Sequence, residues 1–239
     1  MPVNSSLTTK LFAGQRYFRF TSPSFLTANP ALHVKVVDGQ GAKRNPYGSR
    51  YSPKIAETVY LTEDVETCIA EKMFYFHKET VEAIDGMHPL KGLLLPPFNK
   101  TFVMWEVEFK NDVDDVADIT KSYSSFSVFP FLTLSPSQDY EHLKDRRAHI
   151  QAAGYNGLRA PSARSTMGGH MVVMFDDQSG NVQTIKPYEI EFRLLCVGGG
   201  PFTDHTKDML DFTAGEIRVV GSGPLPGYSP SWQKFNFNR

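Results

Sequence analysis

Three residues with complementary chemistry lie close together between Asn45 and Lys72. Arg50 stands in a Gly-Ser turn, Tyr60 in a short apolar segment, and Glu71 in a segment with helical spacing. A guanidinium binds an anion through a fork of donors, and an aromatic ring offers a flat apolar face. With a carboxylate added, these groups are suited to hold and cleave an anionic ribosyl compound. All three residue types are also common on protein surfaces. Other features of the sequence are therefore needed to distinguish a functional site from ordinary surface residues.

The composition is that of a globular protein without a strong electrostatic field. The chain has 239 residues, which suffice for one large domain or two small ones, and 41% of them are hydrophobic and 21% charged. The formal net charge is -1, so we expect no general attraction to nucleic acid or to a membrane. A local basic pocket for a small anion remains compatible with this total.

The sequence lacks the usual marks of metal binding, export and membrane insertion. Cys68 and Cys196 are isolated from each other, and we expect two reduced thiols and no metal site. Four histidines also lack ligand-like spacing: His77, His88, His142 and His149. The N-terminus has no signal-peptide pattern, and no stretch approaches the roughly 18 apolar residues of a membrane span. These features predict a cytoplasmic protein.

Two segments have the spacing of helices. Thr62 suits a helix N-cap, and the first helix should end at about His77. Its expected buried stripe consists of Val65, Cys68, Ile69, Met73 and Phe76. Glu71 falls at the edge of that stripe, so its carboxylate either enters a cleft or faces water. A second helix is predicted over 138–153, ended by Gly154. Its basic cluster, Lys144, Arg146 and Arg147, is expected to be a solvated face, with contact to an acidic partner as the alternative.

The predicted strands are short and do not alternate regularly with helices. They cover 16–20, 33–37, 58–61, 101–109, 157–160, 170–176 and 189–195, and the acidic segment 111–118 is interpreted as a turn. This pattern predicts an α+β fold with a mixed or mostly antiparallel sheet and a few helices. After the glycine triplet that begins at residue 198 the character changes. We therefore expect a domain over 1–197 and a C-terminal extension over 198–239 that lies outside the core.

Several short motifs follow one another in a characteristic order: GQGAKRNPYGSRY, VYL, an Ala-Glu pair on the first helix, GLRAPSAR and GGHMVVMF. In this order the chain resembles the RES domain family over about residues 15–195. The family is named for an arginine, a glutamate and a serine, and is best known as the toxin of bacterial toxin–antitoxin pairs with Xre-type antitoxins. The resemblance implies a fold similar to that of ADP-ribosylating toxins.

The resemblance also implies roles for individual residues. The catalytic residues that it implies are Arg50, Tyr60, Glu71 and Ser162, and the binding residues are Arg19, Tyr51, Arg164 and His170. The family often has tryptophan where this chain has Tyr51, which keeps an aromatic ring. It often has asparagine where this chain has His170, a departure that bears on the contacts at that edge of the site. We expect the implied groups to converge on one cleft that encloses a dinucleotide.

The implied activity is that of a toxin that depletes NAD+. Hydrolysis or phosphorolysis of the nicotinamide–ribose bond is the leading expectation, with NAD+ as substrate and no other cofactor. The alternatives are transfer of ADP-ribose to a protein and nucleotide binding without turnover. The expected partner is a cognate antitoxin or an immunity protein that blocks the site, with no nucleic acid and no membrane. The sequence leaves open a homo-oligomer and delivery into a target cell by a secretion system.

Overall fold

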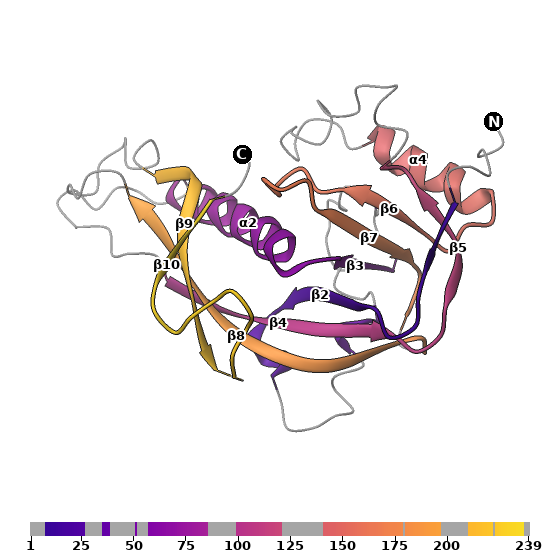
Figure 1. Ribbon diagram of the computed structural model, residues 1–239. Coiled ribbons are helices and arrows are strands. Elements are labelled where there is room, and N and C mark those ends of the chain that lie inside the picture. Colours follow the sequence, from indigo (N-terminus) through magenta and orange to yellow (C-terminus); the bar gives the residue numbers. More distant parts are fainter. Residues whose placement is uncertain are drawn as a thin grey trace.

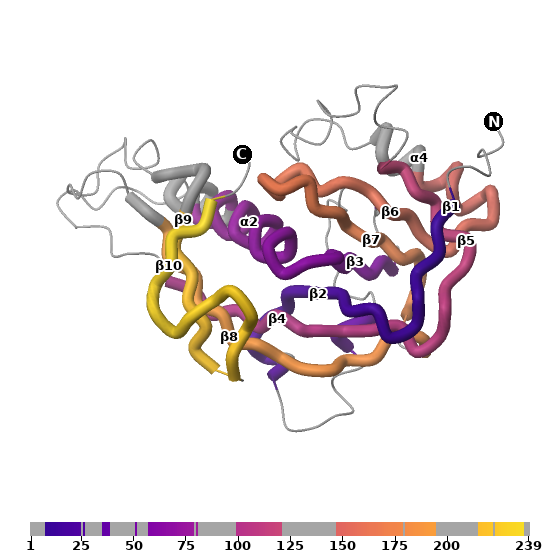
Figure 2. Tube along the Cα trace, in the orientation of Figure 1, coloured from indigo at the N-terminus to yellow at the C-terminus, as the bar shows by residue number. Residues whose placement is uncertain are grey.

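The computed structural model describes residues 8–26, 35–38, 51, 57–85, 99–120, 141–178, 180–196, 210–221 and 223–236, and the structural statements below concern these residues. They form one curved sheet with two α-helices and the short 3-10 helix η2, Pro23–Phe25. Figure 2 follows the chain through these elements and shows the two edge strands, β1 and β10, at opposite sides of the molecule.

The described strands form a ten-stranded sheet in the order β1-β5-β6-β7-β3-β2-β4-β8-β9-β10 (Figure 1). Their bounds are Thr8–Leu11, Arg16–Thr21, Thr58–Thr62, Asn99–Phe109, Val113–Asp118, Gly157–Pro161, His170–Phe175, Val182–Cys196, Leu210–Gly221 and Gln233–Asn236 for β1 to β10. Strands β5 and β6 pair in parallel, and the other described pairs are antiparallel. The predicted α+β class with a mixed, mainly antiparallel sheet is confirmed.

Helix α2, Val65–Asp85, begins where Asp64 caps it. The Thr67 backbone N–H donates to one Asp64 carboxylate oxygen at 2.6 Å, and the Thr67 hydroxyl donates to the other at 2.8 Å. These bonds satisfy a donor that a helix start otherwise leaves open. The predicted helix is confirmed, but its predicted N-cap and end are wrong. Thr62 is the last residue of β3, and α2 continues beyond His77 to Asp85.

The helices cover different parts of the sheet. The apolar stripe of α2, including Ile69, Met73 and Phe76, packs on side chains of β4, β8 and β9. Helix α4, Glu141–Ala152, lies beside β5 and β6 (Figure 1), and Gly154 follows it with a φ of 89°, as the predicted stop requires.

Alternation along the strands places site residues and core residues on opposite faces. On β3, Tyr60 and Thr62 point to the face that carries α2, whereas Val59 and Leu61 point to the other face. The sheet is curved (Figure 1). On that other face lies a second cluster, which includes Tyr17 and side chains from β1, β4, β5 and β7.

Further expectations from the sequence are wrong for the described residues. The strand predicted over 33–37 is one of them, because residues 35 and 36 form a short 3-10 turn and residues 37 and 38 a bend. The acidic segment 111–118 is not only a turn, because Val113–Asp118 forms β5. The expectation that residues 198–239 lie outside the core is wrong for their described part, because Ile217, Leu225 and Phe235 belong to the cluster under α2. The apolar side chains of β9 and β10 complete this cluster from the C-terminal end of the chain. The proposed division after residue 197 stays a prediction.

Candidate active site

A cavity of about 260 Å³ lies between α2 and strands β2, β3 and β7. Its walls are Phe18, Arg19, Phe20, Tyr60, Thr62, Cys68, Glu71, Lys72, Tyr75 and Met171. The question left open for Glu71 is therefore settled, because this residue lines the cavity. Three predicted site residues meet here, namely Arg19, Tyr60 and Glu71.

Ser162 holds the Glu71 carboxylate. The Ser162 hydroxyl donates to Glu71 Oε1 at 2.7 Å. It accepts from the backbone N–H groups of Arg164 at 3.1 Å and Ser165 at 3.3 Å. Because both amides point at the oxygen, the hydroxyl proton is directed toward the carboxylate. Glu71 and Ser162, which are far apart in the sequence, thus act as one unit.

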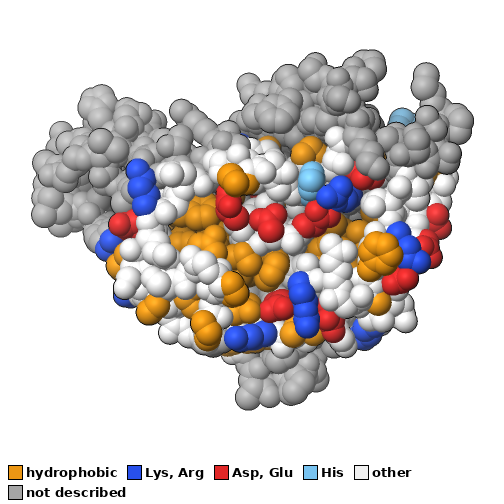
Figure 3. Space-filling model, viewed as in Figure 1, with side chains coloured by type: hydrophobic (Ala, Val, Ile, Leu, Met, Phe, Trp, Pro, Cys, Tyr) orange, Lys and Arg blue, Asp and Glu red, His pale blue; other side chains and the backbone are white. Residues whose placement is uncertain are grey.

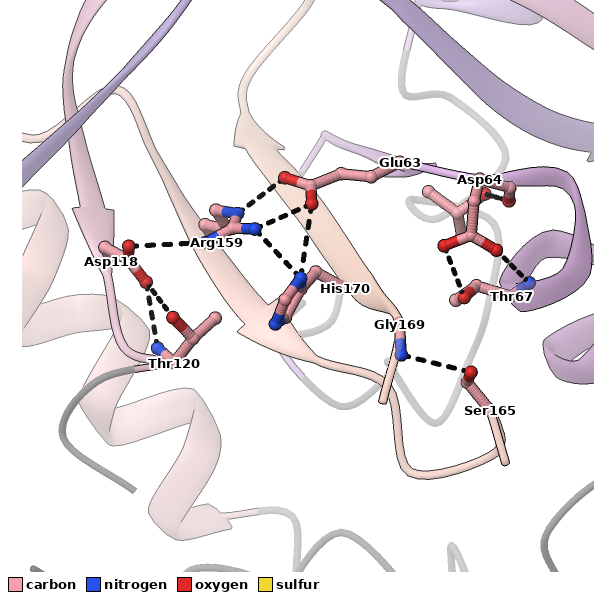
Figure 4. Close-up of polar contacts among 10 residues, drawn as sticks. Glu63, Asp64, Thr67, Asp118, Thr120, Arg159, Ser165, Gly169 and His170 are labelled. Atoms are coloured by element: carbon pink, nitrogen blue, oxygen red, sulfur yellow. Dashed lines mark hydrogen bonds and ion pairs between the residues drawn. The ribbon is translucent and has the colours of Figure 1, made fainter. Parts of the chain in front are cut away.

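The turn that carries Ser162 is docked on the start of α2. Ser162 follows β6, and its N–H donates to the Gly169 carbonyl at 2.8 Å, which closes the turn before β7. The Ser165 hydroxyl accepts from Gly169 N–H at 3.1 Å (Figure 4). The Thr166 hydroxyl donates to Glu66 on α2 at 3.2 Å. This turn therefore fixes Ser162 relative to the helix that carries Glu71.

Tyr60 joins the cavity to the preceding segment. Its hydroxyl accepts from the Tyr51 backbone N–H at 3.0 Å, and its own carbonyl accepts from Arg19 Nη1 at 3.2 Å. Strands β2 and β3 pair only at Phe18 and Thr62. The Tyr60 carbonyl therefore has no backbone partner on β2 and accepts from the Arg19 side chain instead. Tyr51 is fully buried. Its backbone N–H holds the Tyr60 hydroxyl in place, and its own side chain does not line the cavity.

Burial controls the charges around the cavity. It lowers the pKa of the Arg19 guanidinium, and among the described residues no carboxylate forms an ion pair with it. Burial also raises the pKa of the Cys68 thiol to about 12, so this thiol is protonated at neutral pH and is a poor nucleophile. Lys72 packs its ammonium 4.4 Å from the centre of the Phe102 ring.

The surroundings of the cavity are acidic. Glu63 and Asp64 connect β3 to α2, and Glu66 lies in the first turn of α2; all three are half-buried. Figure 3 shows a row of acidic side chains across the middle of the face in view. An anionic ligand is therefore better placed at the cavity wall, where Arg19 and Lys72 lie.

Two predicted binding residues lie away from the cavity wall. The Arg164 guanidinium stacks on the Phe74 ring at 3.5 Å from its centre. His170 accepts from Arg159 Nη2 at 2.8 Å, and Arg159 also donates to Glu63 at 2.5 and 2.8 Å (Figure 4). Because Met171 lines the cavity, alternation along β7 places His170 on the opposite face. The structure thus does not bring His170 to the cavity.

Arg50, the arginine of the predicted catalytic group, lies outside the described residues.

Tyr75 and Lys72 were not predicted as site residues, although their spacing from Cys68 and Glu71 places all four along one side of a helix. The strand residues Phe18 and Phe20 were also missed. Their contribution depends on which strand pairs with β3, which the local pattern does not reveal.

The cavity is small for a whole dinucleotide. Pockets that bury small ligands typically measure about 300 to 1,000 Å³, and this one measures about 260 Å³. The described walls therefore leave room for no more than one end of such a ligand. The expectation that one cleft encloses the entire dinucleotide is not met by the described residues alone.

None of the described helices is long and apolar enough to span a membrane. Within the described part of the chain, no three His, Cys, Asp or Glu side chains are gathered in a way that could hold a metal ion.

Comparison with known proteins identifies one family. The model of the RES domain matches residues 28–195, which leaves Arg19 outside the match. No match was found among curated proteins. A chain of the crystal structure of the M. tuberculosis MbcT–MbcA toxin–antitoxin complex is similar at 15% identity and a TM-score of 0.48, covering 77% of this chain and 87% of that one. This likeness is too distant to carry an argument about function.

Proposed function

Because this chain belongs to the RES domain family, we propose that it is a toxin that cleaves the nicotinamide–ribose bond of NAD+. Water or phosphate takes the ribosyl group, so the protein is an NAD+ glycohydrolase or phosphorylase. NAD+ is the substrate, and the reaction needs no other cofactor. Loss of NAD+ then stops growth of the cell in which the protein acts.

The observation that carries this proposal is the Glu71 carboxylate, held by Ser162 at the wall of a cavity. Cleavage of the nicotinamide–ribose bond builds positive charge on the ribose ring. A fixed carboxylate stabilises this charge in the transition state more than in the substrate, where the ribose carries less of it. A preoriented carboxylate also needs no rearrangement during the reaction.

The remaining cavity residues suit the rest of the substrate. Tyr60 and Tyr75 supply aromatic rings beside Glu71, against which a nicotinamide ring can pack. Arg19 supplies a cation for a phosphate oxygen. Given the volume of the cavity, about 260 Å³, we place the nicotinamide riboside end inside it and the adenosine end beyond it.

The proposed partner is a cognate antitoxin or an immunity protein that covers the mouth of this cavity. The proposal follows from membership in a family best known for toxin–antitoxin pairs. Binding of NAD+ and binding of such a partner should then exclude each other.

The test is to incubate the purified protein with NAD+, with and without phosphate, and to identify the products. Free ADP-ribose with nicotinamide indicates hydrolysis, and a phosphorylated ADP-ribose that appears only with phosphate indicates phosphorolysis. If NAD+ labelled in its ADP-ribose part is used, label that stays attached to a protein indicates transfer of ADP-ribose instead. Intact NAD+ in every reaction, with a folded protein, would refute the proposed activity.

A further inference from the structure

Arg147 on α4 is a buried cation to which no role has been assigned. The sequence places it in a basic cluster expected to face solvent, yet only 2% of the residue is exposed. That expectation is therefore wrong for Arg147. Its guanidinium lies 4.7 Å from the centre of the Phe175 ring, which belongs to β7.

The guanidinium bonds to both ends of one chain segment. Arg147 Nη1 donates to the Tyr51 carbonyl at 3.1 Å and to Thr58 Oγ1 at 2.7 Å. Arg147 Nη2 donates to the Glu57 carbonyl at 3.3 Å. One side chain thus ties residue 51 to residues 57 and 58, where β3 begins.

Burying the Arg147 guanidinium costs folding free energy. Burial lowers the pKa of Arg147, and among the described residues no carboxylate forms an ion pair with it. Three neutral oxygens bond the buried charge, and the Asp176 carboxylate interacts with it from beyond ion-pair distance. An apolar side chain would avoid burying a charge altogether. Packing alone does not explain why an arginine stands here.

The clamped segment supports the candidate site directly. The Tyr51 carbonyl accepts from Arg147, and the Tyr51 N–H donates to the Tyr60 hydroxyl at the cavity. Both backbone groups of Tyr51 are thus fixed, one by each side chain.

We propose that Arg147 is a positioning residue for substrate binding. It holds Tyr51, Glu57 and Thr58 so that the Tyr60 ring is placed for NAD+. This inference rests on the proposed NAD+ cleavage. Because Glu71 is held independently by Ser162, loss of the clamp weakens substrate binding and leaves the chemical step nearly intact.

The test compares Arg147→Met and Arg147→Lys with the wild-type protein. We expect Arg147→Met to raise KM for NAD+ by about tenfold or more, with kcat within about threefold. Arg147→Lys should recover part of the loss, because an ammonium reaches some of the same oxygens. Arg193→Met is the matched control, since Arg193 on β8 stacks on Trp232 away from the cavity, and its KM should stay within about twofold of wild type.

Hydrogen exchange at the Tyr51 amide separates positioning from the reaction. We expect faster exchange in Arg147→Met than in wild type, because the bond to Tyr60 loosens. If Arg147→Met does not fold, Thr58→Val removes one oxygen of the clamp and should raise both KM and exchange moderately. Unchanged KM in a folded variant, or unchanged exchange, would overturn the inference. If wild type releases no nicotinamide, the proposed function fails, and the exchange rates alone decide whether Arg147 is a clamp.

Discussion

At the residue scale, two side chains of α2 that face the same cavity have opposite properties. Glu71 is held by a hydroxyl whose own position is fixed by two backbone amides. Cys68 is also at the wall, but burial raises the pKa of its thiol. The carboxylate is therefore held in a fixed position at the wall, and the neutral thiol provides apolar packing.

The thiol should make stability depend on pH. The pKa of Cys68 rises from 9.0 to about 12 on folding. Between these values the unfolded chain has lost the proton that the native protein keeps, so stability falls as pH rises. We expect wild type to lose stability relative to Cys68→Ala over this window, by up to about 1.4 kcal/mol per pH unit. Urea denaturation at several pH values measures this, and a constant difference between the two proteins would contradict it.

At the scale of elements, the site depends on contact between the β6–β7 turn and the start of α2. A Cβ at Gly169 would lie 1.7 Å from Thr67 Oγ1 and 2.9 Å from Asp64 Oδ2. Only glycine allows the turn to approach the helix cap so closely. The same turn carries Ser162, so this packing determines the geometry of the Glu71 carboxylate.

Gly169→Ala should therefore both destabilise the protein and impair the site. We expect a loss of about 2 kcal/mol in the free energy of unfolding, since the turn must move off the helix. Nicotinamide release should fall as well, because Ser162 moves away from Glu71. Gly180→Ala is the control, because nothing lies within 4 Å of an added Cβ there. Equal denaturation midpoints for the two variants would rule out the close packing.

The elements that carry the site were predictable because their patterns are local. Helix α2 follows from its apolar spacing, and β4 from its alternation, so Glu71 could be placed at the edge of a buried face. Strand β5 was missed because Asp115 adopts a φ of 58° and interrupts the alternation. Its pairing with β1 and β6 comes from distant segments and outweighs the turn preference of its aspartates. The burial of Arg147 depends on long-range packing in the same way.

At the scale of the whole molecule, the C-terminal strands complete the core that supports α2. Strand β9 pairs with β8, and β10 pairs with β9. Their apolar side chains meet Met73 and Phe76 of α2 in one cluster. The helix that carries Glu71 thus packs on residues from the last part of the chain, and removing residues 198–239 should expose its apolar face.

Phe235 on β10 tests this dependence without a deletion. It is 8% exposed and belongs to the cluster under α2. We expect Phe235→Ala to cost about 3 kcal/mol of stability, because the cavity left behind is only partly refilled. Val220→Ala on β9 is the control, since Val220 is 46% exposed and should change stability by less than about 0.5 kcal/mol. Similar losses in both variants, measured by urea denaturation, would show that β10 does not support the core.

The central claim is that the Glu71 carboxylate stabilises the ribosyl cation as nicotinamide leaves. Its most direct test is the rate of nicotinamide release from NAD+ by wild type, Glu71→Gln and Glu66→Gln. Glutamine keeps the shape and still accepts from Ser162, but it lacks the charge. We expect Glu71→Gln to lower kcat by about 100-fold or more, and Glu66→Gln, the same change elsewhere on α2, to leave kcat nearly unchanged. A folded Glu71→Gln protein with undiminished turnover would contradict this account.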